Sequence, residues 1–171
     1  MNAPRNFVVR VCFSKRGKIR FISHRDVARI FERAIRVAGI PIAYSEGFSP
    51  RPRFSFGLAL PTTFESDAEF VDLVLKEPTD PTPFPEQMST ALPDGLVVHS
   101  AAVLEPGSDS LQETVTASSW LLEVRDPAVA MTGQELNDHV GAWIDSILSA
   151  ATIEITQERK GKLVTLSLIH I

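Results

Sequence analysis

The sequence predicts an α+β protein made of two consecutive ferredoxin-like βαββαβ units with antiparallel sheets, the second of which is incomplete. Three observations support this prediction. Apolar residues recur with a period of 2 or of 3.6 in the order βαββαβ over residues 1–104. A segment rich in Gly, Ser, Pro and Asp, expected to be a linker, follows at residues 105–116. The order βαββ then begins again over residues 117–165.

The elements of the first unit follow from periodicity and from signals at their ends. Residues 6–14 alternate, with Phe and Val side chains on one face, which is typical of a half-buried strand. Ser23 and Asp26 have the spacing of a capping box, which predicts a helix to residue 38 that ends before Gly39. The remaining predicted elements are strands at residues 53–60, 68–76 and 96–104 and a short helix that ends near residue 92.

The second unit shows weaker versions of the same signals. A strand is expected at residues 118–125, and Thr132 with Glu135 forms a capping box for a helix to residue 149. Residues 152–158 and those from 163 onward predict a hairpin. Residues 166–171 resemble the translated end of a transposon adapter used in DNA library preparation. We therefore expect them to be a non-native tail on a chain that is naturally longer; the alternative is a genuine β-strand with this sequence.

The charges are distributed unevenly along the chain. Residues 1–60 hold 12 Lys and Arg against 3 acids, a balance of 12 − 3 = +9. The other residues hold 5 bases against 18 acids, a balance of 5 − 18 = −13. Such a difference predicts either a polyanion-binding face on the first part or two parts that attract each other.

Composition excludes several classes of protein. The single cysteine, Cys12, rules out a disulfide framework and gives no cluster for zinc or for iron and sulfur. No apolar run approaches the roughly 20 residues that cross a bilayer, and no secretory signal is present. We therefore expect a cytoplasmic protein without a cofactor, a metal ion or a membrane partner.

Three motifs follow each other in the first half of the chain. The runs are IRFISHRDVARIFERAIRVA (residues 19–38), GIPIAYSEGFSPRPRFSFGLALP (39–61) and AEFVDL (68–73). They closely resemble the radical SAM-associated protein family, a domain of uncharacterised function. The resemblance implies a partner, because that family is fused to or encoded beside radical SAM proteins with a cobalamin-binding region, or encoded near ribonuclease E/G. Arg25 stands where the family usually has an apolar residue, and Thr63 where a Gly is common.

The predicted helix carries a row of arginines opposite its apolar face, and a basic turn precedes it. Side chains in such a row are spaced to meet successive phosphates of a nucleic acid. The alternative is a solvated surface on which Glu32 pairs with Arg36 and Arg29. The predicted nucleic-acid-binding residues are Lys18, Arg20, Arg25, Arg29, Arg33, Arg36, Tyr44, Arg51 and Arg53.

The last three of these lie in a loop at residues 44–53. Arg51 stands between two prolines, which should hold it extended with little freedom to lose on binding. Tyr44 and Phe48 offer aromatic faces on which an unpaired base could stack. Alternatively, both rings fill the core beneath a rigid loop.

Two further groups of side chains allow other chemistry. On the polar face of the sheet, Asp72 should form an ion pair with Arg10, although Glu69 and Asp72 could instead serve as acid and base. His24, at the start of the helix, could act as general acid or base in metal-independent RNA cleavage, as in other tandem ferredoxin-like endoribonucleases.

The sequence therefore leaves three hypotheses. The leading one is an RNA-binding accessory module without catalysis of its own, which presents RNA to a radical SAM or ribonuclease partner. The second is a protein adaptor for a radical SAM protein or ribonuclease E/G, and the third is an endoribonuclease that uses His24.

Overall fold

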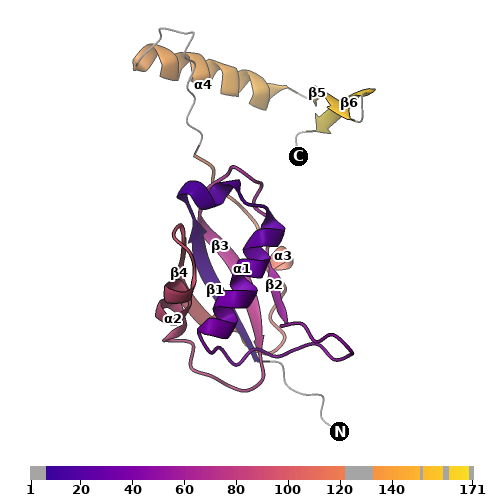
Figure 1. Cartoon of the computed structure of the whole chain (residues 1–171). Coiled ribbons are helices and arrows are strands. Elements are labelled where there is room, and N and C mark those ends of the chain that lie inside the picture. Colours follow the sequence, from indigo (N-terminus) through magenta and orange to yellow (C-terminus); the bar gives the residue numbers. More distant parts are fainter. Residues whose placement is uncertain (1–6, 122–132, 151, 160–161, 170–171) are drawn as a thin grey trace. The chain divides into compact units, whose positions relative to one another are not determined.

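The computed structural model describes residues 7–121, 133–150, 152–159 and 162–169, the last two ranges in their backbone only. The chain divides into two units, Met1–Ser119 and Trp120–Ile171. The first contains a four-stranded sheet and the second a helix and a hairpin (Figure 1).

The first unit has the predicted element order βαββαβ, with two short additions. Its elements are β1 (Phe7–Lys15), the 3-10 helix η1 (Gly17–Phe21), α1 (His24–Val37), β2 (Phe54–Phe56), β3 (Ser66–Leu75), α2 (Phe84–Ala91), β4 (Leu96–Val103) and α3 (Leu111–Thr114). All strand pairs are antiparallel, and the strand order is β2-β3-β1-β4. The protein is therefore α+β, as predicted.

One core holds this unit together. Alternate residues of β1 turn toward α1 and α2, and Val9, Val11 and Phe13 are buried there. From α1, Phe31 packs against Phe13 with ring centroids 4.6 Å apart. Burial of a large apolar side chain contributes roughly 1.5–3 kcal/mol to the stability of the fold. The apolar face of each strand and helix therefore points inward. The arginines of α1 consequently point outward.

The start of α1 is set by the predicted cap. The Ser23 hydroxyl accepts a hydrogen bond from the Asp26 N–H at 3.2 Å. At the other end, Gly39 has a φ of +69°, a left-handed conformation that glycine adopts without steric cost. The apolar face of α1 does not reach the last residue of the helix, because Val37 is exposed.

β2 is shorter than the predicted strand at residues 53–60. The N–H of Gly57 still donates to Phe70, but the carbonyls of Phe56 and Gly57 accept hydrogen bonds from the Gln112 side chain at 3.2 and 3.3 Å. A Cβ on Gly57 would lie 3.4 Å from Leu111. The segment that carries α3 thus packs where a longer β2 would continue.

The second unit contains α4 (Gln134–Ser149), β5 (Thr152–Arg159) and β6 (Lys162–Ile169), and the two strands form the predicted antiparallel hairpin. Of the strand expected at 118–125, residues 118–121 are not in a strand and the others lie outside the described residues. Thr132 of the predicted capping box also lies outside them. None of the described helices has the length and apolar character to cross a membrane.

Candidate nucleic-acid interface

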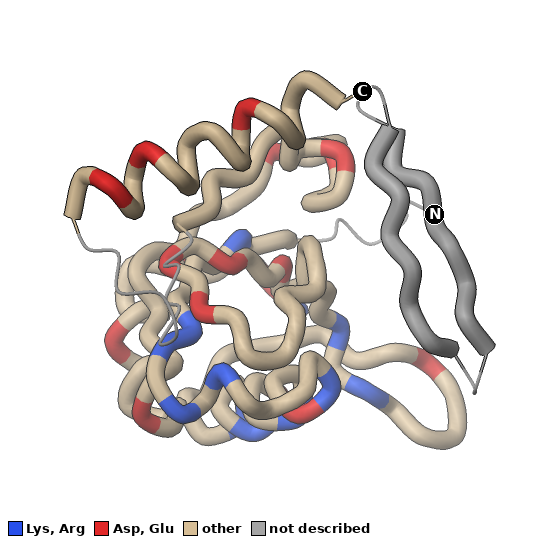
Figure 2. Tube along the Cα trace, turned by 90° about the horizontal axis from the view of Figure 1, so that it is seen from above, with Lys and Arg blue, Asp and Glu red and all other residues tan. Residues whose placement is uncertain are grey.

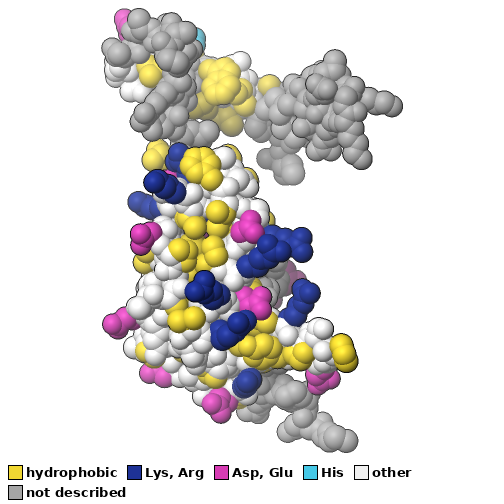
Figure 3. Space-filling view, viewed as in Figure 1, with side chains coloured by type: hydrophobic (Ala, Val, Ile, Leu, Met, Phe, Trp, Pro, Cys, Tyr) yellow, Lys and Arg dark blue, Asp and Glu magenta, His cyan; other side chains and the backbone are white. Residues whose placement is uncertain are grey.

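The outer face of α1 displays the predicted row of arginines. Arg25, Arg29, Arg33 and Arg36 are all exposed, because the opposite face is buried in the core. Lys and Arg side chains gather around this helix, with a few acids among them (Figure 3). The row of cations is therefore accessible to a large ligand.

Two of these arginines have acidic partners within the helix. Arg29 Nη1 lies 3.2 Å from Asp26 Oδ1, and Arg36 Nη2 lies 3.6 Å from Glu32 Oε1. Within the described residues, Arg25 and Arg33 form no ion pair. Surface pairs of this kind contribute only about 0.3–0.5 kcal/mol each, so a phosphate can displace the carboxylate.

The basic turn before α1 is partly neutralised by acids ahead of and at the start of β3. Arg20 Nη1 lies 3.1 Å from Glu65 Oε1, and its guanidinium stacks over Phe21 at 4.9 Å. Arg16 forms an ion pair with Asp67. Lys18 is exposed and forms no ion pair within the described residues. The turn thus offers less free positive charge than its sequence suggests.

The loop at residues 44–53, called here the 44–53 loop, projects from the sheet (Figure 1). Tyr44 bridges to Pro52, Ser45 N donates to Arg51 O at 2.8 Å, and Arg51 N donates to Ser45 Oγ at 3.0 Å. Arg51 and Arg53 are exposed. Phe48 is fully exposed at 106%, so the interpretation that it fills the core is wrong.

The other face of the sheet carries Arg10 and Asp72. The guanidinium donates from Nε and Nη2 to the two carboxylate oxygens at 2.8 and 2.9 Å, and this bidentate hydrogen bond raises the pKa of Arg10. Arg10 Nη2 also donates to the carbonyl of Asp109 at 3.3 Å. Asp72 is therefore engaged in an ion pair that holds the chain before α3 against the sheet.

His24 lies in a small polar cluster with Lys15 and Glu69 at the end of the core. The three line a cavity of about 10 Å³ together with Phe13, Val27, Phe56 and Leu60. Lys15 is only 2% exposed, and its ammonium donates to the carbonyls of Arg20 and Ile22 at 3.4 Å each. Burial lowers the pKa of Lys15 and raises the pKa of Glu69.

The titratable side chains of this cluster can hold a proton, and its cavity has room for about one water molecule. It is too small for a ribose or a phosphate group, so it gives the His24 cleavage hypothesis no substrate pocket within the described residues. The sequence did indicate that Lys15 would be buried. Extending the alternation of β1 by one position puts this lysine on the buried face with Phe13.

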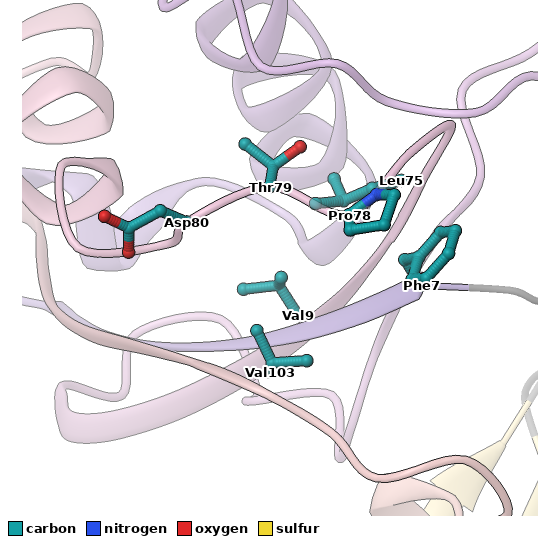
Figure 4. Close-up of a pocket in the computed structure, with 7 residues that line it drawn as sticks. All are labelled: Phe7, Val9, Leu75, Pro78, Thr79, Asp80 and Val103. Atoms are coloured by element: carbon teal, nitrogen blue, oxygen red, sulfur yellow. The ribbon is translucent and has the colours of Figure 1, made fainter.

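A second, larger cavity lies at the Phe7 end of β1, the end opposite Lys15 (Figure 4). Its volume is about 230 Å³ and its wall is mainly apolar. The lining residues are Phe7, Val9, Leu75, Pro78, Thr79, Asp80 and Val103. None of them belongs to the predicted site.

Metal chemistry finds no support in the part of the chain that the structure describes. No group of three or more His, Cys, Asp and Glu side chains there could hold an ion. Cys12 is a free thiol, and burial raises its pKa, which disfavours the reactive thiolate.

Comparison with models of protein families gives a match over most of the chain. Residues 9–168 match the model of a family described as "Uncharacterized protein conserved in bacteria (DUF2344)". No curated protein and no solved structure shows a significant match to the chain. The predicted domain of uncharacterised function is thereby confirmed, and the description of the family names no activity.

Proposed function

Because the chain belongs to this family of conserved bacterial proteins, for which no activity is described, we propose a function from the geometry: an RNA-binding module that presents RNA to a partner enzyme. The expected partner is a radical SAM or ribonuclease-type enzyme. The RNA would lie on the outer face of α1 and on the 44–53 loop.

The observation that carries this proposal is the exposed arginine row of α1. Like charges at i and i+4 repel each other, and Arg25, Arg29 and Arg33 follow each other at that spacing. Such a row is costly for a surface with no ligand, and a polyphosphate chain removes the cost by neutralising it. Arg51 and Arg53 add cations on a second element.

Internal pairing limits the number of contacts. Arg16 and Arg20 have carboxylate partners, which leaves Lys18, Arg25, Arg33 and Arg51 as the principal cations, with Arg29 and Arg36 available after exchange of a weak pair. About four neutralised phosphates would give a log-log salt slope of about 3 for single-stranded RNA.

We also infer that the two units are tandem ferredoxin-like domains. The order βαββαβ with the strand order β2-β3-β1-β4 supports this for the first unit, and the helix followed by a hairpin supports it for the second.

Fluorescence anisotropy with a labelled single-stranded RNA over a range of salt concentrations tests the RNA-binding proposal. The double variant Arg25→Gln/Arg33→Gln should bind more weakly and lower the slope by about 1.4, which is about 0.7 for each lost contact. Arg16→Gln is the matched control, because its guanidinium already pairs with Asp67, and it should bind like the original protein.

Absence of RNA binding at low salt would contradict the proposal. A complex with an acidic partner protein that survives nuclease treatment and is lost in the double variant would instead support an adaptor.

A further inference from the structure

The 44–53 loop is a stiff structure with a well-defined tip. Two hydrogen bonds between Ser45 and Arg51 close its stem, and the N–H of Arg53 donates to the carbonyl of Ala43 at 2.8 Å. Gly47 at the tip has a φ of +119°, which an L side chain rarely adopts. The loop therefore holds its shape before any ligand binds, and little conformational entropy is lost on binding.

The tip of this stiff loop is aromatic. Phe48 is 106% exposed, so both faces of its ring are open to solvent. Tyr44, nearer the stem, is 42% exposed, and the Lys76 ammonium lies 5.5 Å from its ring centroid. Phe48 is thus the ring that is free to receive a ligand.

Single exposed apolar residues are common and need no explanation by themselves. Phe48 differs because of what surrounds it. Arg51 and Arg53 follow it within five residues on the same loop, and Pro50 and Pro52 flank Arg51. An exposed ring on the same loop as two arginines suits a nucleotide, whose base and phosphate need these two kinds of contact.

We propose that the 44–53 loop selects RNA with an unpaired base, a proposal that rests on the RNA-binding function proposed above. The base stacks on Phe48 while the phosphate of the same nucleotide contacts Arg51. Paired bases in an A-form helix are stacked on each other and offer no free face. Bases in single strands, loops and bulges do. The substrate class is therefore RNA with an accessible unpaired base, and a blunt duplex is excluded from this contact.

Two RNA probes of equal length and charge test the proposal, a hairpin with an unpaired loop and a blunt duplex. A 2-aminopurine in the hairpin loop reports stacking by a change in its fluorescence. The original protein should prefer the hairpin and change this fluorescence. Phe48→Ala should weaken hairpin binding by about fivefold to about 150-fold and leave duplex binding unchanged.

Two further variants separate stacking from simple apolar contact. Phe48→Trp should keep both the affinity and the fluorescence change, whereas Phe48→Leu should lose both. Hairpin binding by Phe48→Leu equal to that of the original protein would overturn the proposal and favour an apolar pocket of a partner protein. Because Phe48 contacts no core residue, all three variants should unfold at the original midpoint.

The outcomes distinguish this proposal from the one on which it rests. If the original protein binds neither probe, both proposals fail. If it binds with the expected salt slope but Phe48→Ala binds the hairpin equally well, only the stacking proposal fails.

Discussion

Thr63 adopts a φ of +79°, in the left-handed region that β-branched residues rarely occupy. Its N–H donates to the carbonyl of Arg20 at 2.8 Å, so the hydrogen bond holds the residue in this conformation and ties the segment before β3 to η1. In the family that the motifs resemble, a Gly is common at this position, and glycine adopts the same conformation without strain.

Replacing Thr63 by Gly should therefore stabilise the protein. Relief of left-handed strain is worth about 1–2 kcal/mol, and the greater entropy of an unfolded glycine offsets about 0.5–1 kcal/mol of it. We expect Thr63→Gly to raise the free energy of unfolding by about 0.5–1 kcal/mol in urea titrations. Thr62→Gly, at a neighbouring position without a positive φ, should lower it. Equal behaviour of the two variants would show that Thr63 is not strained.

Glu69 makes stability depend on pH. Burial raises the pKa of Glu69 above its ordinary value of 4.5, although Ser66, Lys15 and His24 oppose the shift. Between 4.5 and the raised value, the folded state binds more protons than the unfolded state, so the contribution of this group to stability falls as pH rises through that window.

Glu69→Gln removes this titration while it keeps the shape of the side chain. We expect the variant to gain stability relative to the original protein as pH rises from 4.5 to neutrality, in urea titrations at several pH values. Glu113→Gln is the opposite control. Hydrogen bonds from Ser110 lower the pKa of Glu113. The contribution of Glu113 to stability is therefore present above pH 4.5 and is lost as pH falls through the lowered pKa. The same pH dependence in both variants would rule out the explanation.

At the scale of elements, the ion pair between Arg10 and Asp72 joins β1 to β3. The side chains are only 16% and 12% exposed, and Arg10 also reaches the carbonyl of Asp109 before α3. Removing the carboxylate leaves a largely buried guanidinium whose other partner is the more distant carbonyl of Asp109. The loss of one member of such a pair costs more than the pair contributes.

We therefore expect Asp72→Asn to lower the free energy of unfolding by about 2–3 kcal/mol. Asp67→Asn, which removes the partner of the exposed Arg16, should cost at most about 1 kcal/mol. Chemical denaturation of both variants checks the difference. Protection of the amides of α3 from hydrogen exchange should fall in Asp72→Asn alone, and unchanged protection would mean that the ion pair does not hold this segment.

Periodicity could predict β1, β3, β4 and α1 to within two residues because each of them buries one face in the same core. It could not predict the end of β2 or the existence of α3. A four-residue helix has no measurable period, and its buried residue, Leu111, packs near Gly57 from a distant part of the sequence. These features depend on two segments more than 50 residues apart, which no local pattern contains.

The residues of the candidate site also divide into those that local sequence predicts and those that it does not. The exposure of the α1 arginines follows directly from the apolar face on the other side of the helix. The exposure of Phe48 does not follow from local sequence, since the sequence of a loop does not show whether an aromatic ring packs on the core or lies in solvent. The predicted strand ends at residue 14, one position before Lys15, although the alternation of β1 continues to this buried lysine. Because lysines are seldom buried, a lysine at the end of an alternating run gives little indication that the strand continues.

At the scale of the whole molecule, the charge segregation read from the sequence is partly cancelled inside the first unit. Arg10, Arg16 and Arg20 pair with Asp72, Asp67 and Glu65, all from residues 65–72. The arginines of α1 have no partner among residues 65–72. They therefore indicate a binding surface more specifically than the balance of +9 over residues 1–60 does. In contrast, α4 carries acids and neither Lys nor Arg (Figure 2).

This arrangement predicts that residues 1–119 fold alone and contain the whole RNA-binding surface. The buried core cluster lies entirely within them, and so do all the predicted contact residues. They hold 13 of the 17 Lys and Arg against 14 acids, a balance of 13 − 14 = −1 compared with −4 for the chain.

A protein ending at Ser119 should unfold cooperatively in calorimetry and bind the single-stranded RNA with the salt slope of the full chain. The slope reports the number of phosphates neutralised, and none of the predicted contacts is removed. The affinity should be equal or higher, because the removed part carries a balance of −4 − (−1) = −3 and repels RNA. A smaller slope would place phosphate contacts in the second unit. A transition that is not cooperative would mean that the first unit depends on the second for its stability.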